Sequence, residues 1–273
     1  MVAVVTESAA NVPPDVALRL GITVVPLVLH IGGRSYRDGV DMSGPAFYER
    51  LTAGDHVSTA APSVGDFLNG MERAGSDEVV CVTLAGGLSA SNHQASLAAE
   101  RFGGHAVVVD SGSATMGEGF VAIEAARAAL GNAGIDGVVA RAREVAEAVH
   151  VVGTVETFDY LKRSGRVSRL QAYAATALNI HPVFRMDGGE IAAVGRPRTR
   201  GRALTAVIDE VVTGSEGRPL HIAAFHALAE DAAHELARRI AEQADVVESH
   251  VVDSTPVIGA NTGPGLVGVA AFS

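Results

Sequence analysis

Short apolar runs alternate with longer amphipathic stretches through the first half of the chain. The apolar runs are rich in β-branched residues and have the length of buried strands: residues 2–5, 23–30, 78–84 and 106–109. The stretches between them have the periodicity of helices: residues 13–20, 44–51, 63–74, 91–102 and 117–130. Strands that alternate with helices in this way predict βαβ units and a mostly parallel sheet flanked by helices.

The pattern changes near residue 150. A helix over residues 157–163 is expected to end at Gly165, and the turn Asp187-Gly188-Gly189 predicts a hairpin within residues 183–194. The remaining segments read as a helix, a strand, a helix and two strands: residues 203–213, 220–225, 229–244, 246–252 and a glycine-rich strand that ends at Phe272. We therefore expect an N-terminal α/β domain over residues 1–150 and a C-terminal α+β domain with a mixed sheet over residues 151–273. A ligand is expected between them.

Composition narrows the class of protein. The 273 residues are 48% hydrophobic and 19% charged, which argues against disorder, and the net charge of −10 argues against nucleic-acid binding. No apolar run is long enough for an integral membrane segment, and the N-terminus lacks the pattern of a signal peptide, so we expect a cytoplasmic protein. The cluster Arg196, Arg198, Arg200 and Arg202 fits a solvated loop face and a docking patch equally well.

Polar clusters follow the predicted strands. They are residues 6–8, 58–63, 86–91 and 110–113. In an open α/β sheet, ligands bind beyond the carboxyl ends of the strands, and the N–H groups of a loop that precedes a helix suit an anion. Any one of these clusters can equally be an ordinary turn or helix cap, since Ser, Thr, Asp and Gly are common there.

Several catalytic motifs are missing. The Gly86-Gly87 loop matches neither a dinucleotide-binding nor a P-loop pattern, and the sequence contains no GxSxG elbow and no HExxH motif. The single cysteine, Cys81, lies in an apolar run and fits a buried hydrophobic position. We accordingly assign no catalytic residue, no metal and no cofactor.

Two later segments fit a ligand site. Arg166 follows a turn glycine and could hold an anion through its fork of donors. Residues 259–265 are expected to form a tight Gly/Pro turn that carries Asn261 and Thr262 close to a ligand or to the other domain.

In order and spacing, these segments resemble the DegV family nearly from end to end. The segments that carry the resemblance are Thr6-Glu7-Ser8, Pro26-Leu27, Tyr36-Arg37-Asp38-Gly39-Val40-Asp41, Thr59-Ala60-Ala61-Pro62-Ser63, Ala85-Gly86-Gly87-Leu88-Ser89-Ala90-Ser91, Asp110-Ser111, Met116-Gly117-Glu118-Gly119, Leu161 with Gly165-Arg166-Val167, Leu178-Asn179-Ile180-His181-Pro182, Asp187-Gly188 and Thr262-Gly263-Pro264-Gly265. The resemblance implies the family's EDD fold and one long-chain fatty acid as ligand, held in a buried apolar tunnel.

The resemblance also implies the residues that bind the ligand and a partner. Thr59 and Ser89 would hydrogen-bond the carboxylate beside the loop N–H groups near Ala90, with Arg166, Asn261 and Thr262 close to the head group. Asn261 stands where the family has a histidine, so this position donates hydrogen bonds but cannot be protonated. Some members of the family present the fatty acid to a separate ATP-dependent kinase subunit of the dihydroxyacetone-kinase-like type, which forms an acyl phosphate.

A second hypothesis stays open at this point. The same loops could form the active site of an enzyme that acts on a small acidic or phosphorylated metabolite. Glu7, Asp110 or a histidine would then be the general base. Such an enzyme predicts a short, polar cavity, whereas the carrier predicts a long apolar one.

Overall fold

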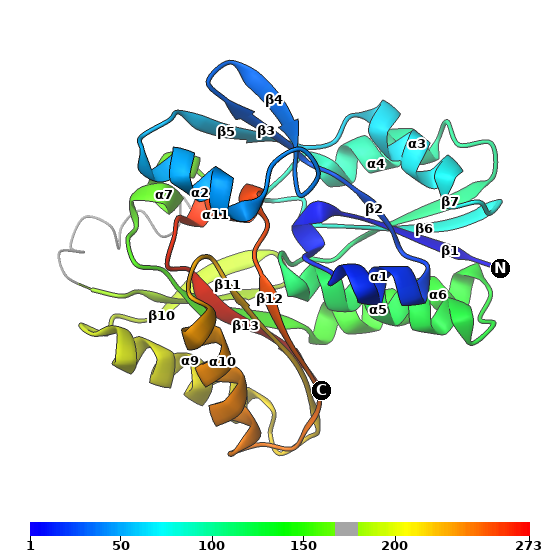
Figure 1. Ribbon diagram of the computed structural model, residues 1–273. Coiled ribbons are helices and arrows are strands. Elements are labelled where there is room, and N and C mark those ends of the chain that lie inside the picture. The colour runs from blue at the N-terminus through cyan, green and yellow to red at the C-terminus, as the bar shows by residue number, and fades with distance from the viewer. Residues whose placement is uncertain (167–179) are drawn as a thin grey trace.

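The computed structural model describes residues 1–166 and 180–273 and arranges them around three sheets (Figure 1). The first sheet, sheet A, has the order β2-β1-β6-β7, and all of its neighbouring strands are parallel. Its strands are β1 (Ala3–Glu7), β2 (Thr23–Val25), β6 (Glu78–Thr83) and β7 (His105–Asp110). The α/β class and the parallel sheet expected from the sequence are confirmed.

Helices cover both faces of sheet A (Figure 1). One face carries α3 (Val64–Arg73) and α4 (Ser91–Ala99), and the other carries α1 (Pro14–Leu20), α5 (Met116–Leu130) and α6 (Ile135–Ala148). Side chains alternate between the two layers, so Cys81 packs with the α3/α4 layer while Val80 and Val82 pack with the α5 layer. This two-sided burial explains why the strands read as continuous apolar runs.

The helix boundaries follow the signals in the sequence. The Asp66 N–H donates to Ser63 Oγ at 3.1 Å, and the Ser63 N–H donates to the Asp66 carboxylate at 2.9 Å, which completes a capping box at the start of α3. The helix α7 (Asp159–Ser164) ends at Gly165, whose φ of 70° is easily adopted only by glycine.

The second sheet, sheet B, was not foreseen. It is antiparallel, with the order β4-β3-β5, and consists of β3 (Val28–Ile31), β4 (Arg34–Arg37) and β5 (Val57–Ala60), with α2 (Gly44–Thr52) between the last two. The prediction of one strand over residues 23–30 is wrong, because β2 belongs to sheet A and β3 to sheet B. Pro26 separates them, since proline has no N–H for a ladder.

The third sheet, sheet C, is mixed, as expected. Its order is β10-β9-β8-β13-β11-β12, and only β11 and β12 pair in parallel. Its strands are β8 (His150–Thr154), β9 (Val183–Asp187), β10 (Glu190–Gly195), β11 (Leu220–His226), β12 (Val246–Asp253) and β13 (Val267–Phe272). The helices α9 (Arg200–Gly214) and α10 (Glu230–Ala241) pack on one face, and α5 contacts the sheet from the other side.

The segment after β12 also differs from its prediction. Residues 259–262 belong to the helix α11 (Pro256–Thr262), and the turn begins only at Gly263. A Cβ on Gly259 would lie 2.3 Å from the Tyr48 hydroxyl of α2. The glycine therefore allows two helices to pack closely and does not mark a turn.

One apolar core joins the sheets. It includes Val80 of sheet A, Leu29 of sheet B and Phe225 of sheet C, all fully or almost fully buried. The motif residues Val167, Leu178 and Asn179 lie outside the described residues. Within residues 1–166 and 180–273, no helix is long and apolar enough to cross a membrane.

Candidate functional site

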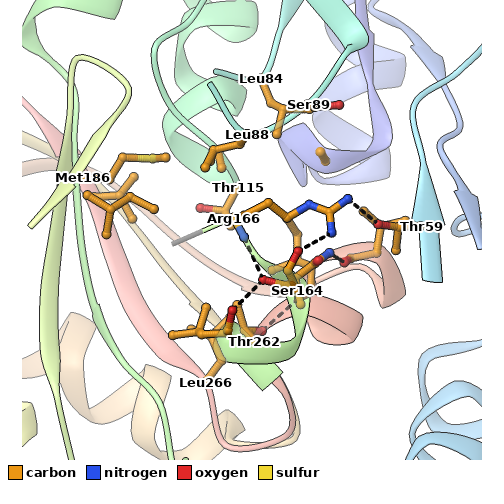
Figure 2. A pocket seen from close by; sticks show the side chains of 18 of the residues that line it. Thr59, Leu84, Leu88, Ser89, Thr115, Ser164, Arg166, Met186, Thr262 and Leu266 are labelled. Carbon is orange, nitrogen blue, oxygen red and sulfur yellow. Dashed lines mark hydrogen bonds between the residues drawn. The ribbon is translucent and has the colours of Figure 1, made fainter. Parts of the chain in front are cut away.

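A cavity of about 130 Å³ lies where the three sheets meet. A single water molecule needs roughly 10–15 Å³ on this measure, so the space can hold a ligand of many heavy atoms. Its apolar wall comes from every part of the fold: Leu27, Leu84, Leu88, Val151, Leu161, Phe184, Met186, Ile191, Phe225, Val257, Ile258 and Leu266. In Figure 2, Met186 of β9 and Thr59 of β5 lie on opposite sides of this space.

Thr59 and Arg166 form a pair at the cavity wall (Figure 2). Arg166 Nη2 donates to Thr59 Oγ1 at 3.3 Å, and Arg166 Nη1 donates to the Ser164 carbonyl at 3.0 Å. Because the Thr59 oxygen accepts this bond, its own hydrogen stays available for a ligand. The pair offers a hydroxyl donor beside a positive charge, which suits a carboxylate.

Ser89 also lines the cavity, but its hydroxyl already has partners. The Ser91 N–H donates to Ser89 Oγ at 3.2 Å, and the hydroxyls of Ser89 and Ser91 lie 3.0 Å apart. The Ser91 hydroxyl lies 2.5 Å from a carboxylate oxygen of Glu7, at the end of β1. The side chain that faces the cavity is thus connected to a buried acid.

Asn261 and Thr262 line the cavity from α11, yet both side chains bond their own helix. Asn261 Nδ2 donates to the Val257 carbonyl at 2.7 Å, and Thr262 Oγ1 donates to the Ile258 carbonyl at 2.9 Å. The Asn261 oxygen and a second amide hydrogen remain for other partners.

Ala90 does not belong to the cavity wall. It is exposed and precedes the first residue of α4. The free N–H groups expected in this loop are also partly occupied, because the Gly86 N–H donates to Asp110 at 3.0 Å. The carboxylate of Asp110 also accepts from the Gly112 N–H at 2.9 Å. The N–H groups of Gly86 and Gly112 are therefore not available to an anion at this loop.

Three of the four polar clusters meet at one edge of sheet A, because β1, β6 and β7 are parallel neighbours. The cluster over residues 58–63 does not follow a strand of that sheet, since Thr59 lies within β5 of sheet B. It reaches the cavity from a different direction.

Two features of the site were missed by the sequence reasoning. Thr115 lines the cavity with a hydroxyl that has no partner among the described residues, and its φ of 53° is rare for a β-branched residue. Glu118 is fully buried one helical turn later and accepts a bond from the Thr6 hydroxyl at 3.0 Å. The bond between Thr6 and Glu118 spans 112 positions, so no local pattern predicts it. A threonine before a helix, such as Thr115, usually indicates only a helix cap.

Burial dominates the charge state of these acids. It raises the pKa of Glu7 from 4.5 to about 7, against the lowering effect of bonds from Ser91 and the Leu84 N–H. Burial also raises the pKa of Glu118 well above its usual value, and the nearby Glu7 charge adds to the effect. Within the described part of the chain, no group of His, Cys, Asp and Glu side chains is arranged to hold a metal ion.

The chain is similar to known proteins along its whole length. A DegV domain-containing protein of Streptomyces coelicolor is 33% identical over 276 residues, which cover 100% of this chain and 98% of the relative. A solved DegV family protein of Thermus thermophilus, described as binding fatty acid, has 30% identity and a TM-score of 0.95, with 100% and 99% of the two chains covered. The DegV protein of Bacillus subtilis, described as a fatty acid binding protein, has 26% identity, a TM-score of 0.89 and the same coverage.

A family model agrees with these similarities. The model described as an uncharacterised protein of the DegV family matches residues 1–273. The resemblance found in the sequence is therefore confirmed, and the chain belongs to the DegV family.

Proposed function

We propose that this protein binds one long-chain fatty acid, with the acyl chain in the apolar cavity and the carboxylate held by Thr59, Ser89 and Arg166. The observation that carries the proposal is a cavity walled by aliphatic and aromatic side chains, with its hydroxyl donors and one guanidinium at the wall. The described fatty-acid binding of the related structures supports the same ligand.

The energetics suit such a ligand. Each buried methylene contributes about 0.8 kcal/mol, so a palmitoyl tail contributes roughly 11 kcal/mol before the cost of ordering the chain. A carboxylate buried without partners would cancel several kcal/mol of this. Hydroxyl and guanidinium donors at the wall remove that cost, and Asn261 has donor capacity left to assist them.

Mass spectrometry of an organic extract of freshly purified protein tests the proposal. We expect about one acyl chain per protein, and folded, never delipidated protein without lipid would contradict it. In a binding titration at pH 6, Ser89→Ala should weaken palmitate binding by about 1 kcal/mol, roughly fivefold. Ser96→Ala in α4, the helix that follows the loop of Ser89, removes a hydroxyl that donates to the Asn92 carbonyl, and it should leave the affinity unchanged.

We propose further that the protein catalyses nothing by itself and presents the carboxylate to a separate ATP-dependent kinase subunit. The γ-phosphoryl group of ATP would pass to a carboxylate oxygen, giving an acyl phosphate and ADP. This step rests on the family resemblance. Loaded protein incubated with such a kinase subunit and ATP should yield acyl phosphate, detected as hydroxamate, and neither component alone should do so.

A further inference from the structure

A chain of polar groups runs from the cavity wall to the interior of sheet A. It begins at the Ser89 hydroxyl, passes 3.0 Å to the Ser91 hydroxyl and 2.5 Å to Glu7 Oε2. The other Glu7 oxygen accepts from the Leu84 N–H at 2.9 Å. Glu7 and Ser91 are fully buried, so these contacts are shielded from solvent.

The protonation state of Glu7 determines which group donates in each hydrogen bond of this chain. When Glu7 is ionised it can only accept, so the Ser91 hydroxyl must give its hydrogen to Glu7. The bond between the two serines then has to be donated by Ser89. In that state the Ser89 oxygen offers the cavity only lone pairs, which repel a carboxylate.

Protonation of Glu7 exchanges donor and acceptor in both hydrogen bonds of the chain. The Glu7 O–H then donates to Ser91, and Ser91 passes its own hydrogen to Ser89 Oγ. Ser89 also accepts from the Ser91 N–H, so its hydrogen has no remaining acceptor within this chain. It becomes free to bond a carboxylate in the cavity.

The surroundings of Glu7 favour a protonation change near neutral pH. Three acidic groups face it from neighbouring elements: Glu118 of α5, Asp110 of β7 and Cys81 of β6. Burial, reinforced by the Asp110 charge, brings the pKa of Glu7 to about 7. Among the described residues that line the cavity there is no His, Cys, Asp, Glu, Lys or Tyr side chain.

We propose that Glu7 positions the Ser89 hydroxyl through Ser91, so that binding of a fatty-acid carboxylate at Ser89 is accompanied by uptake of one proton from solvent at Glu7. This inference rests on the proposed function and adds a residue to it. Glu7 need not touch the ligand, because it acts through the hydrogen that Ser91 gives up or keeps.

The test is the affinity for palmitate between pH 6 and 9. A carboxylic acid of ordinary pKa is ionised throughout this range, so the ligand itself does not change. For the wild type we expect the affinity to fall about fivefold between pH 6 and pH 9 as Glu7 ionises near pH 7, because the one hydrogen bond that Ser89→Ala also removes is lost. Hexadecanol can donate its hydroxyl hydrogen to Ser89, so its affinity should not fall.

Two variants separate Glu7 from other titrating groups. Glu7→Gln keeps the shape and places a permanent amide donor against Ser91, so palmitate affinity should stay high and flat with pH. Ser91→Ala releases Ser89 by a different route and should also give a flat profile. It serves if the glutamine variant fails to fold. Glu72→Gln, on the exposed side of α3, should keep the wild-type profile.

The outcomes distinguish the two proposals. Palmitate bound equally well by the wild type at pH 6 and pH 9 would overturn the role of Glu7 and leave the carrier function intact. The same conclusion follows if Glu7→Gln and Ser91→Ala retain the wild-type pH dependence. A wild type that binds no palmitate at any pH would overturn the proposed function and the role of Glu7 with it.

Discussion

Two groups of buried and half-buried glutamates have opposite surroundings. Glu7 at the end of β1 and Glu118 of α5 lie in the interior, where the groups that shift their pKa values are acids and hydrogen-bond donors without charge. Glu124 and Glu248 lie between α5 and sheet C, where arginines and histidines surround them. The residue type is the same, and the partners decide its charge.

The second group is a well-paired ion cluster. Arg127 of α5 bonds both oxygens of Glu248 at 2.6 and 2.8 Å, and His221 and His250 bond the same carboxylate at 2.8 and 2.9 Å. Burial raises the pKa of Glu248, but the bonds from His250, Arg127 and His221 outweigh it and hold that pKa well below its usual range. This carboxylate remains charged and joins the two halves of the fold.

The contrast shows where the molecule keeps an unfavourable arrangement. An uncompensated buried acid lowers stability, and such groups occur mainly at sites that bind or react. The ion cluster has a structural role, whereas Glu7 is connected to the cavity wall through Ser91 and Ser89. Breaking each of them should therefore have effects of different sign and pH dependence.

The largest effect is expected from Arg127→Ala. It leaves Glu124 and Glu248 with less compensation, and because Arg127 is about one-third exposed we expect a loss of about 2–3 kcal/mol, below the range for a fully buried pair. Urea unfolding at pH 7 measures it. Arg238→Ala removes two ion pairs from the exposed face of α10 and should barely change the midpoint. Equal losses in the two variants would contradict the comparison.

The second effect concerns Glu118→Gln and has the opposite sign. Because the pKa of Glu118 is raised in the folded state, the native protein holds a proton that the unfolded chain has released above about pH 4.5. Wild-type stability therefore falls by about 1.4 kcal/mol for each pH unit and proton as pH rises through this window. The variant should be the more stable protein at pH 8, and the gap should narrow by the same amount per pH unit as the pH falls toward 5. A gap independent of pH would show that Glu118 does not titrate.

At acid pH, the two groups of glutamates should again affect the stability of the fold in opposite ways. A carboxylate with a lowered pKa, such as Glu248, contributes stability above about pH 4.5 and loses it as pH falls further. Wild-type stability should therefore decline below pH 4 through Glu248 and above pH 5 through Glu7 and Glu118. Thermal unfolding from pH 3 to 9 would show a maximum near pH 5, and a maximum at pH 8 would contradict this account.

The smallest effect is expected from Thr115→Val. The buried hydroxyl has no partner among the described residues, so its removal should stabilise ligand-free protein by about 1 kcal/mol. Differential scanning calorimetry on delipidated protein measures this. A loss of palmitate affinity in the same variant would place a polar part of the ligand at Thr115 instead of a methylene.

The sequence predicted those parts of the fold that depend on local chemistry. Ser63 begins a helix because its hydroxyl satisfies an N–H of the first turn, and Gly188 and Gly189 form the hairpin turn because both have positive φ. The sheet change at Pro26 and the packing of Gly259 against Tyr48 depend on contacts between distant segments. No pattern along the chain records those contacts.

The candidate site divides in the same way. The order of the motifs leads us to expect Thr59, Ser89 and Arg166 at one site. All three line the same cavity, although Arg166 follows Thr59 by 107 positions. Ala90 does not line this cavity, and the direction in which a loop points cannot be read from its composition. The contact of Glu7 with Ser91 spans 84 positions, and only the pairing of β1 with β6 makes it visible.

The last strand of the chain occupies a central place in sheet C. β13 lies between β8 and β11 and pairs with both, so each of those strands lacks one of its two neighbours until residues 267–272 are in place. Val151 and Phe225, which line the cavity, belong to those two strands. Their final positions therefore depend on β13, and a nascent chain in which this strand is not yet in place exposes an unfinished apolar surface.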